Sequence, residues 1–416
     1  MTRHQDSAPA SPAGTGPVPR LRARSTAGHL PQDAAREAVD AYLAAGGPLS
    51  IADGSGVIGE LERTAAELLG VAGTLSYNSG TSALHAAFLG LDLPPGSEVA
   101  APVLGFHACV SPAMTAGLSA VLVDVDPLTG TMDPAALAAA AGPRTRAVVV
   151  VHYLGHPADM TAIGAVCADR GLRLVGDCSH AYLSAWRGQP VGTFGDVACW
   201  SMQERKTWTA GEGGLLAAAD RGLFERALTA GHYRGRLYTE LTSTRLREFA
   251  ETGFGLKHRM HPLAAVVALA AAPALRDRVA RRQEQLTRLS AALAAVPGIT
   301  PPVIRDGADM GGWFSYRPAV PGLGGAALDR FLGRLRAAGV PAHHSDTGAL
   351  DDLALFRKPV PLQAAAGTWR PRLCGPFAGA RAYERGRFSV TVAGDDTPAR
   401  IDGYAGAIAR ILGETG

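Results

Sequence analysis

One lysine in the segment SMQERKTWTAGEGG has the clearest chemical potential in this chain. Lysine is rare here: Lys206, Lys257 and Lys358 are the only three among 40 basic side chains, and the other 37 are arginines. Arginine keeps its proton in proteins, whereas lysine can lose its proton and then act as a nucleophile or form a Schiff base. Lys206 is therefore a candidate for covalent chemistry. The alternative is a solvated surface lysine without a function.

Four further side chains lie at or just after the ends of predicted strands. Asp177 ends the apolar run RLVGD and His180 follows it, while Phe106 comes shortly after the run EVAAPVL. Ser201 lies near the end of VACWSMQ, five residues before Lys206. Ligands of open α/β sheets bind beyond the carboxyl ends of the strands, so we expect these residues at one site. Taken singly, Asp177 is equally well explained as a turn or cap residue, and His180 and Phe106 are more often core residues than cofactor contacts.

The segment NSGTSALHAAFLG is a turn that opens a predicted helix, with Gly80 and Thr81 at its start. Backbone N–H groups at a helix N-terminus suit a phosphate group. A lysine, a carboxylate, flat side chains and a phosphate seat are together what pyridoxal phosphate requires. In that interpretation Lys206 forms the Schiff base, and Asp177 keeps the pyridine nitrogen protonated.

Apolar runs of strand length alternate with helical patterns through most of the chain. The predicted strands are 98–104, 119–126, 146–154, 173–177, 197–203 and 213–219. The predicted helices include 33–47, 59–71, 133–142, 160–171 and 279–296. Apolar strands separated by helices predict an α/β fold, with a mostly parallel sheet covered by helices on both faces.

Composition divides the chain into three parts. Residues 1–28 are rich in Ala, Pro, Gly and Ser, which predicts a disordered N-terminal tail. Residues 29–297 are expected to form the large domain. A Pro- and Gly-rich stretch near its end marks the start of a smaller C-terminal α+β domain over residues 298–416.

The charge distribution counts against nucleic acid or a membrane as the main partner. The formal net charge is +3, and residues 1–30 carry all of it, so the remaining body is neutral. Five cysteines without CxxC spacing indicate a reducing, cytoplasmic environment. The N-terminus lacks the apolar stretch of a signal peptide, and the longest apolar run, 263–272, is too short to cross a bilayer.

On these segments the chain resembles the DegT/DnrJ/EryC1/StrS aminotransferases, fold-type I pyridoxal-phosphate enzymes that aminate keto-sugars and cyclitols. The matching segments are NSGTSALHAAFLGLDLPPGSEVAAPVLGF, VVVVHYLGHPADM, GDCSHAY, GTFGD, SMQERKTWTAGEGG and GLKHRMHPLAAV. The lysine segment and GDCSHA are most similar to those of the glutamine:scyllo-inosose aminotransferases. The resemblance implies a PLP-binding large domain.

The resemblance implies a role for each side chain around the lysine. Lys206 would bind the cofactor and carry the proton between substrate and cofactor. Asp177 would pair with the pyridine nitrogen. His180 would contact the ring or its hydroxyl group, and Phe106 would cover the ring.

It also implies how the phosphate is bound and how the subunits assemble. Gly80, Thr81 and Ser201 match the phosphate cup, which the partner subunit of a homodimer completes from the segment GLKHRM. Most family members have Asn at the position that aligns with Lys257, so here a cation is expected to meet the phosphate. The implied reaction transfers an amino group from L-glutamine or L-glutamate to a keto-cyclitol or keto-sugar in secondary metabolism, and no metal is expected.

Two alternatives remain open at this point. The first is other pyridoxal-phosphate chemistry, by an aminohydroxybenzoate synthase or a sugar dehydratase; Lys206 counts against the dehydratases, which have histidine there. The second is a non-catalytic partner subunit. The intact set of Lys206, Asp177 and Ser201 counts against that role, whereas Gly105, where Thr is usual, leaves it open.

Several other motifs have weaker functional interpretations. GSGVIG (54–59) matches a dinucleotide-binding pattern, but no clear strand precedes it. The histidines of HYLGH (152–156) do not share a helix face, which disfavours a metal site. Arg234 and Arg236 are expected either to be solvated or to bind the donor carboxylate. Aromatic and histidine side chains that are candidates for the acceptor pocket are Trp313, Phe314, Tyr316 and His343.

Overall fold

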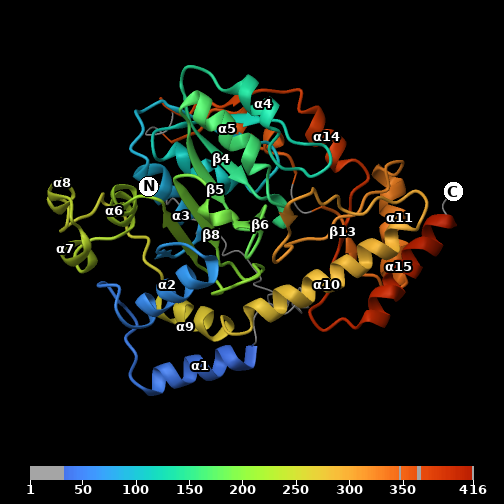
Figure 1. Ribbon diagram of the computed structural model, residues 1–416, viewed down its shortest axis with the longest axis horizontal. Helices are drawn as coiled ribbons and strands as arrows, with labels where there is room; N and C mark the ends of the chain where they lie inside the picture. Colours follow the sequence, from blue (N-terminus) through green and yellow to red (C-terminus); the bar gives the residue numbers. More distant parts are fainter. Residues whose placement is uncertain (1–31, 346–347, 363–366, 415–416) are drawn as a thin grey trace, which may run out of the picture.

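The computed structural model describes residues 32–345, 348–362 and 367–414, so the tail predicted at 1–28 lies outside the described residues. Its largest element is an eight-stranded sheet with the order β1-β9-β8-β5-β4-β2-β3-β12 (Figure 1). The strands are β1 (Leu75–Tyr77), β2 (Glu98–Pro102), β3 (Ser119–Val123), β4 (Thr145–Val151), β5 (Arg173–Asp177), β8 (Val197–Ser201), β9 (Gly214–Ala218) and β12 (Arg372–Leu373).

Most of this sheet is parallel. All neighbours from β12 across to β8 pair in parallel, whereas β9 runs antiparallel between β8 and β1. Every residue of β2 and β3 is buried, as expected for strands that are covered on both faces. The predicted α/β class with a mostly parallel sheet is confirmed.

Successive residues of a strand point to opposite faces of the sheet. Since these strands are apolar, both faces carry apolar side chains, and helices cover both. Val99 and Ala101 of β2 join a core with α3 and α6, whereas Ala100 joins a second core with α4 and α5. The helices are α1 (Gln32–Ala44), α2 (Gly56–Leu69), α3 (Gly80–Gly90), α4 (Pro134–Ala140), α5 (Met160–Arg170), α6 (Arg221–Gly231), α7 (Arg236–Glu240), α8 (Thr244–Arg247), α9 (Pro262–Ala271), α10 (Leu275–Ala294), α11 (Gly325–Ala337), α12 (Ala354–Arg357), α14 (Ala378–Glu384) and α15 (Pro398–Gly413).

Capping residues fix where several of these helices begin. Asp133, Asp159 and Asp220 each accept a backbone N–H from the first turn of the following helix, and Ser79 does the same at the start of α3. Each of the six predicted strands matches an observed strand that lies within the predicted range or one residue outside it, whereas β1 and β12 of the same sheet were not predicted. The predicted helices shift by at most four residues at either end.

The C-terminal part has a core of its own. Leu286, Leu289 and Leu293 from the second half of α10 pack in one cluster with Phe331 of α11 and Ile408 of α15. Figure 1 shows α10, α11 and α15 gathered at the end of the molecule opposite α7 and α8. The long helix α10 therefore belongs to both parts of the chain, since it continues directly from the α9 region of the large domain.

Part of the C-terminal half returns to the large sheet. The short strand β12 pairs with β3. Phe356, Trp369 and Tyr383 are buried in the same core as Val99 and Ala101 of β2. Three short strands, β6 (Ala185–Trp186), β7 (Gln189–Pro190) and β10 (Ala308–Asp309), form a small separate sheet, and β11 (Ala342–His343) pairs with β13 (Ser389–Val390). The division at residue 298 stays a prediction.

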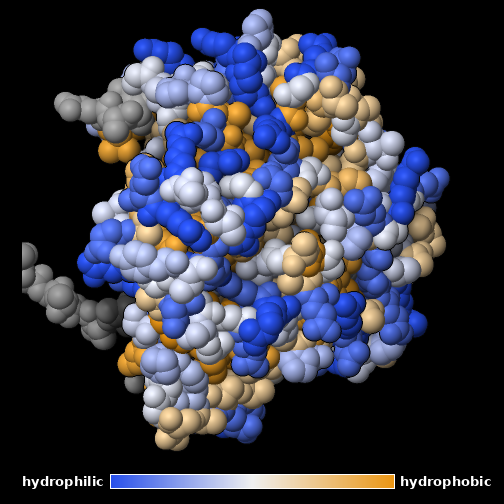
Figure 2. Space-filling view, turned by 60° about the vertical axis from the view of Figure 1, so that its left-hand side comes forward, coloured by the Kyte–Doolittle hydropathy of each residue, from blue (hydrophilic) through white to orange (hydrophobic). Residues whose placement is uncertain are grey.

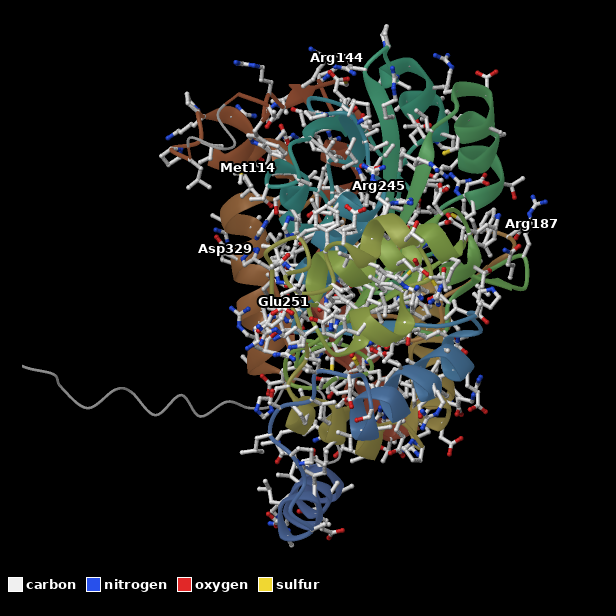
Figure 3. All side chains as sticks on the ribbon, turned by 90° about the vertical axis from the view of Figure 1, so that its left-hand side faces the viewer. Met114, Arg144, Arg187, Arg245, Glu251 and Asp329 are labelled. Carbon is white, nitrogen blue, oxygen red and sulfur yellow. The ribbon has the colours of Figure 1, made fainter. Side chains whose placement is uncertain are left out.

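Polar side chains cover much of the surface. Figure 2 shows hydrophilic residues over most of one face, with apolar residues scattered between them. Charged side chains such as Arg144, Arg187 and Asp329 project outward at the edges in Figure 3. In the described part of the chain, no helix combines the length and the apolar character that crossing a membrane requires.

Candidate active site

Strands β5 and β8 bring the predicted acid and the predicted lysine segment together. The two strands are parallel neighbours, with Asp177 opposite Cys199, so the chain segments that follow them leave the sheet side by side. The Asp177 side chain is buried, and its Oδ1 accepts the backbone N–H of Ser179 at 3.0 Å. Burial raises the pKa of Asp177, and the ammonium of Lys206 acts against that rise.

Lys206 lies in the turn after β8, where its backbone N–H bonds to the carbonyl of Gln203 at 2.8 Å. Burial lowers the pKa of its amine to about 8, although the nearby carboxylate of Asp177 favours the charged form. Near neutral pH a useful fraction of this amine is therefore unprotonated. An ordinary surface lysine has a pKa near 10.4, so its neutral fraction would be more than a hundredfold smaller.

His180 is buried beside this pair. Its ring stacks on Phe314 with 4.1 Å between centroids and 6° between planes. Within the described chain its Nδ1 is buried and has no hydrogen-bond partner. Burial, followed by the charges of Lys206 and Arg317, lowers the pKa of His180 well below its usual value, so the ring is neutral.

The turn before α3 lies directly against the end of β8. The Ser79 hydroxyl accepts the backbone N–H of Ser82 at 3.0 Å and caps the helix. A Cβ atom at Gly80 would lie 2.7 Å from Cβ of Ser201, closer than real contacts allow. Only glycine lets the helix start approach Ser201 so closely, and Thr81 beside it is exposed.

Two predicted cofactor residues lie on the surface of the described chain. Phe106 is 55% exposed on the segment after β2, where its ring packs against His107 with 4.4 Å between centroids. Lys257 is also exposed, while the carbonyl of the next residue, His258, accepts the backbone N–H of Asn78 at 2.7 Å. The segment of Lys257 is thus anchored next to the α3 turn, and the roles of Phe106 and Lys257 stay predictions.

The four candidate residues for the acceptor pocket do not lie together in the structure. Phe314 lies at the site, with its ring centroid 4.5 Å from Nζ of Lys206. Trp313 is buried next to it, whereas Tyr316 bonds to Ser290 inside the C-terminal core and His343 lies in β11. No local pattern in the sequence distinguishes Phe314 from its aromatic neighbours. The only local signal is the Gly-Gly pair before Trp313, which permits close backbone approach.

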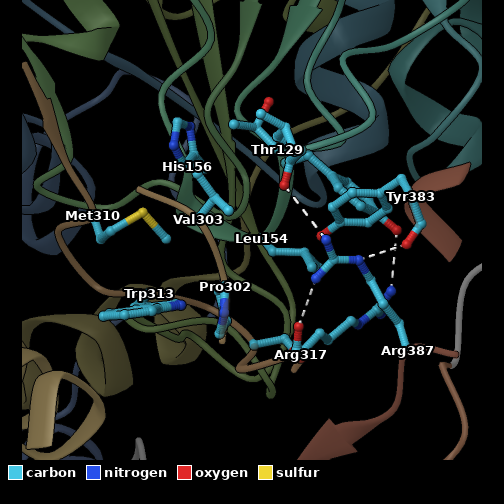
Figure 4. Close-up of a pocket in the computed structure, with 13 residues that line it drawn as sticks. Thr129, Leu154, His156, Pro302, Val303, Met310, Trp313, Arg317, Tyr383 and Arg387 are labelled. Carbon is cyan, nitrogen blue, oxygen red and sulfur yellow. Dashed lines mark hydrogen bonds between the residues drawn. The ribbon is translucent and has the colours of Figure 1, made fainter. Parts of the chain in front are cut away.

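A pocket is lined by residues from both parts of the chain, among them Thr129, Arg317 and Arg387 (Figure 4). Tyr153 forms part of its wall and contacts the His180 ring, with 6.4 Å between centroids. Arg317 donates to the hydroxyl of Tyr153 at 3.1 Å, and Arg387 donates to the carbonyl of Arg317 at 2.9 Å. Both arginines are buried and bonded to protein groups, so they serve as links between the two parts of the chain.

The weaker motifs have structural roles. From residue 32, where the described chain begins, no strand precedes GSGVIG. Gly54 makes room for the guanidinium of Arg236, which bonds to Glu62 and Glu240 in a buried network. Arg234 pairs with Glu251 on the surface. His152 Nδ1 accepts the N–H of Ala158 at 3.1 Å. Among the described residues, no group of three or more His, Cys, Asp or Glu side chains could hold a metal ion.

A family model decides the classification of this chain. The model of the DegT/DnrJ/EryC1/StrS aminotransferase family matches residues 44–366. The chain belongs to this family. The predicted family membership and enzyme class are thereby confirmed.

Individual relatives agree with this family. The 3-amino-5-hydroxybenzoate synthase of Amycolatopsis mediterranei is 34% identical over 291 residues, which cover 70% of this chain and 73% of that protein. The L-glutamine:2-deoxy-scyllo-inosose aminotransferase of Streptoalloteichus tenebrarius is 36% identical over 257 residues, 61% of this chain and 60% of that protein. A crystal structure of 3-amino-5-hydroxybenzoic acid synthase superposes with a TM-score of 0.77 at 28% identity, covering 92% of this chain and 98% of that one.

Proposed function

We propose that this aminotransferase uses pyridoxal phosphate to move an amino group from L-glutamine or L-glutamate to a keto-cyclitol or keto-sugar in secondary metabolism. The observation that carries the proposal is Lys206, whose amine has a pKa of about 8 beside the buried carboxylate of Asp177. The relatives named for amination of an inosose and for synthesis of an aminohydroxybenzoate support a cyclic ketone as the acceptor.

The residues present fit this cofactor. The buried Asp177 carboxylate, with its raised pKa, would be stabilised by a cationic N–H such as that of a pyridinium ring. His180 Nδ1 has no hydrogen-bond partner in the described chain and is available to a ring hydroxyl. The close approach of Gly80 to Ser201 places backbone N–H groups and a hydroxyl side by side, as a phosphate requires.

When bound, pyridoxal phosphate supplies an electron-accepting ring that stabilises the charge formed as the Cα–H bond of the amino donor breaks. Residues of the chain would move and hold the protons. The neutral amine of Lys206 would accept the Cα proton of the donor and deliver it to the C4′ carbon of the cofactor. The negative charge of Asp177 would hold a proton on the ring nitrogen. Burial of Lys206 lowers the pKa of its amine and so raises the fraction that is neutral near pH 7.

We also propose a homodimer, in which Lys257 reaches the phosphate group of the partner's site. The exposed position of Lys257 beside the α3 turn supports this assignment. In Figure 1, α1 and the α7–α8 region project from the body. Exposed large apolar side chains that a second copy would cover include Leu43, Leu49, Phe106, Tyr238, Phe249 and Phe254.

All five cysteines are free, which supports the cytoplasm as the compartment.

Visible absorbance of the full-length protein with pyridoxal phosphate tests the role of Lys206. We expect the wild-type protein to give the band of a lysine-bound cofactor, and one of L-glutamine or L-glutamate to bleach it. Lys206→Ala should fold normally and give no such band, whereas Lys358→Ala, which removes an exposed lysine, should keep it. A lysine-bound band that persists in Lys206→Ala would show that another lysine binds the cofactor.

A second candidate is synthesis of an aromatic amine, because a 3-amino-5-hydroxybenzoate synthase is among the relatives in both sequence and structure. The two reactions differ in their products. An aminotransferase gives a saturated amine from its ketone, whereas the synthase reaction gives a product with strong ultraviolet absorbance. Product absorbance after incubation with cyclic ketones, with and without a ring carboxylate, would distinguish them.

A further inference from the structure

A segment of the C-terminal half enters the site between the elements that carry the lysine and the acid. This segment, 311–314, comprises Gly311, Gly312, Trp313 and Phe314. A Cβ atom at Gly312 would lie 2.6 Å from Oγ1 of Thr207, the residue after Lys206. A Cβ atom at Gly311, whose φ is +49°, would overlap the backbone of the loop that follows Asp177. Two glycines are therefore needed for the segment to fit.

Further contacts hold the segment in place. The N–H of Gly312 bonds to the carbonyl of Tyr182 at 2.7 Å. The half-buried Arg282, from α10, donates through Nε to the carbonyl of Trp313 at 2.8 Å and through a second nitrogen to that of Phe314 at 3.4 Å. The segment is thus fixed to the loop after β5 on one side and to α10 on the other.

The position of the segment determines what Phe314 can contact. Its ring stacks on His180 with 4.1 Å between centroids and only 6° between planes. Nζ of Lys206 lies 4.5 Å from the centroid of the same ring, within the range of a cation–π contact. Asp177, on β5, is the charged group that raises the pKa of the Lys206 amine, and His180 is neutral.

We propose that Phe314 is a positioning residue for Lys206: its ring covers the amine and fixes the His180 plane, so the C-terminal half sets the state of the catalytic lysine. The aromatic face stabilises the ammonium, whereas the bulk of the ring keeps water away and favours the neutral amine. These two effects oppose each other, and different substitutions separate them. The inference rests on the proposed role of Lys206, although the contact itself can be measured without the cofactor.

Competitive labelling of the cofactor-free, full-length protein with acetic anhydride measures the protonation of Lys206 directly. The chain has only three lysines, so Lys257 and Lys358 serve as internal references in the same digest. Peptide mass spectrometry gives the labelling rate of each lysine from about pH 6 to about pH 10, and the midpoint of that curve reports the amine's pKa.

Phe314→Leu keeps apolar bulk but removes the aromatic face, so we expect the Lys206 midpoint to fall by roughly half a pH unit. Phe314→Ala admits water, so the midpoint should rise. Phe314→Tyr should keep the wild-type midpoint. Phe331→Leu, a matched change in the C-terminal core where Phe331 packs on Phe388, should leave the midpoint unchanged.

Equal midpoints in the wild-type, Leu and Ala proteins would overturn the inference. A shift of the same sign in Phe314→Leu, Phe314→Ala and Phe331→Leu would also overturn it, because general loosening would then explain the effect. Neither result bears on whether Lys206 binds the cofactor, since the absorbance of Lys206→Ala answers that question separately.

Discussion

At the scale of single residues, the site depends on two charged groups that burial disfavours in the folded state, the buried carboxylate of Asp177 and the half-buried amine of Lys206. Burial raises the pKa of Asp177 and lowers that of Lys206, and their mutual attraction offsets only part of each shift. Buried ion pairs often contribute less to stability than neutral residues of the same shape. The proposed reaction requires both groups, and we infer that the chain retains them at a cost in stability.

We therefore expect the double variant Asp177→Asn/Lys206→Met of the cofactor-free protein to be more stable than the wild type at pH 7. The expected gain in the free energy of unfolding is about 1–4 kcal/mol, because no buried charge remains. Either single variant leaves one charge without its partner and should be less stable than the double variant. Urea unfolding at pH 7 measures all four proteins, and a double variant less stable than the wild type would contradict the argument.

The pH dependence of this difference has a definite sign. The folded pKa of Lys206, about 8, lies below the ordinary lysine value of about 10.4, so the unfolded chain binds more protons between these two values. The stability contributed by this group is fully present above about pH 10.4 and is lost as the pH falls through about 8. The advantage of the double variant should therefore shrink as the pH rises from 7 to about 10, which repeated urea titrations would show.

At the scale of elements, the contact between α3 and β8 depends on the missing side chain of Gly80. A Cβ atom there would lie 2.7 Å from Cβ of Ser201. Gly80→Ala should push the helix start away from Ser201, lower the free energy of unfolding by about 1–3 kcal/mol and weaken binding of pyridoxal phosphate.

The matched control for this change is Gly164→Ala, inside α5, where a Cβ atom would meet nothing within 4 Å. Because alanine is the better helix former, this control should gain about 0.5–1 kcal/mol and keep cofactor affinity. Thermal melts and cofactor titrations of both variants give the comparison. Equal cofactor affinity in the two variants would show that the phosphate does not bind at the α3 turn.

At the scale of the whole molecule, the proposed homodimer divides each site between two chains. If Lys257 acts in the partner's site, a mixed dimer of a Lys206→Ala chain and a Lys257→Ala chain has one site with both lysines. Lys206→Ala homodimers should be inactive, and Lys257→Ala homodimers should bind the cofactor about tenfold more weakly or worse.

The mixed dimer, isolated through two different affinity tags, should regain roughly half of the wild-type activity per dimer at low cofactor concentration. Titration of activity with pyridoxal phosphate distinguishes one strong site from one weak site. A mixed dimer with only weak-affinity activity would show that Lys257 does not act across the subunit interface.

The sequence alone determined the sheet and the residues that follow its strands. Runs such as 146–154 contain consecutive apolar residues because parallel strands are covered on both faces, and this signal is local. Asp177, His180, Ser201 and Lys206 were found for the same reason, since chemistry in such folds lies where strands end.

Only the tertiary structure decided which distant segments meet. Phe314 reaches Lys206 because two glycines let the 311–314 segment pass Thr207, and this closeness depends on packing between segments more than a hundred residues apart. Arg236 was expected either to be solvated or to bind the donor carboxylate, whereas in the structure it is buried and bonds to Glu62. Local patterns specify strands, helices and their ends, whereas contacts between remote side chains are set by how the elements pack.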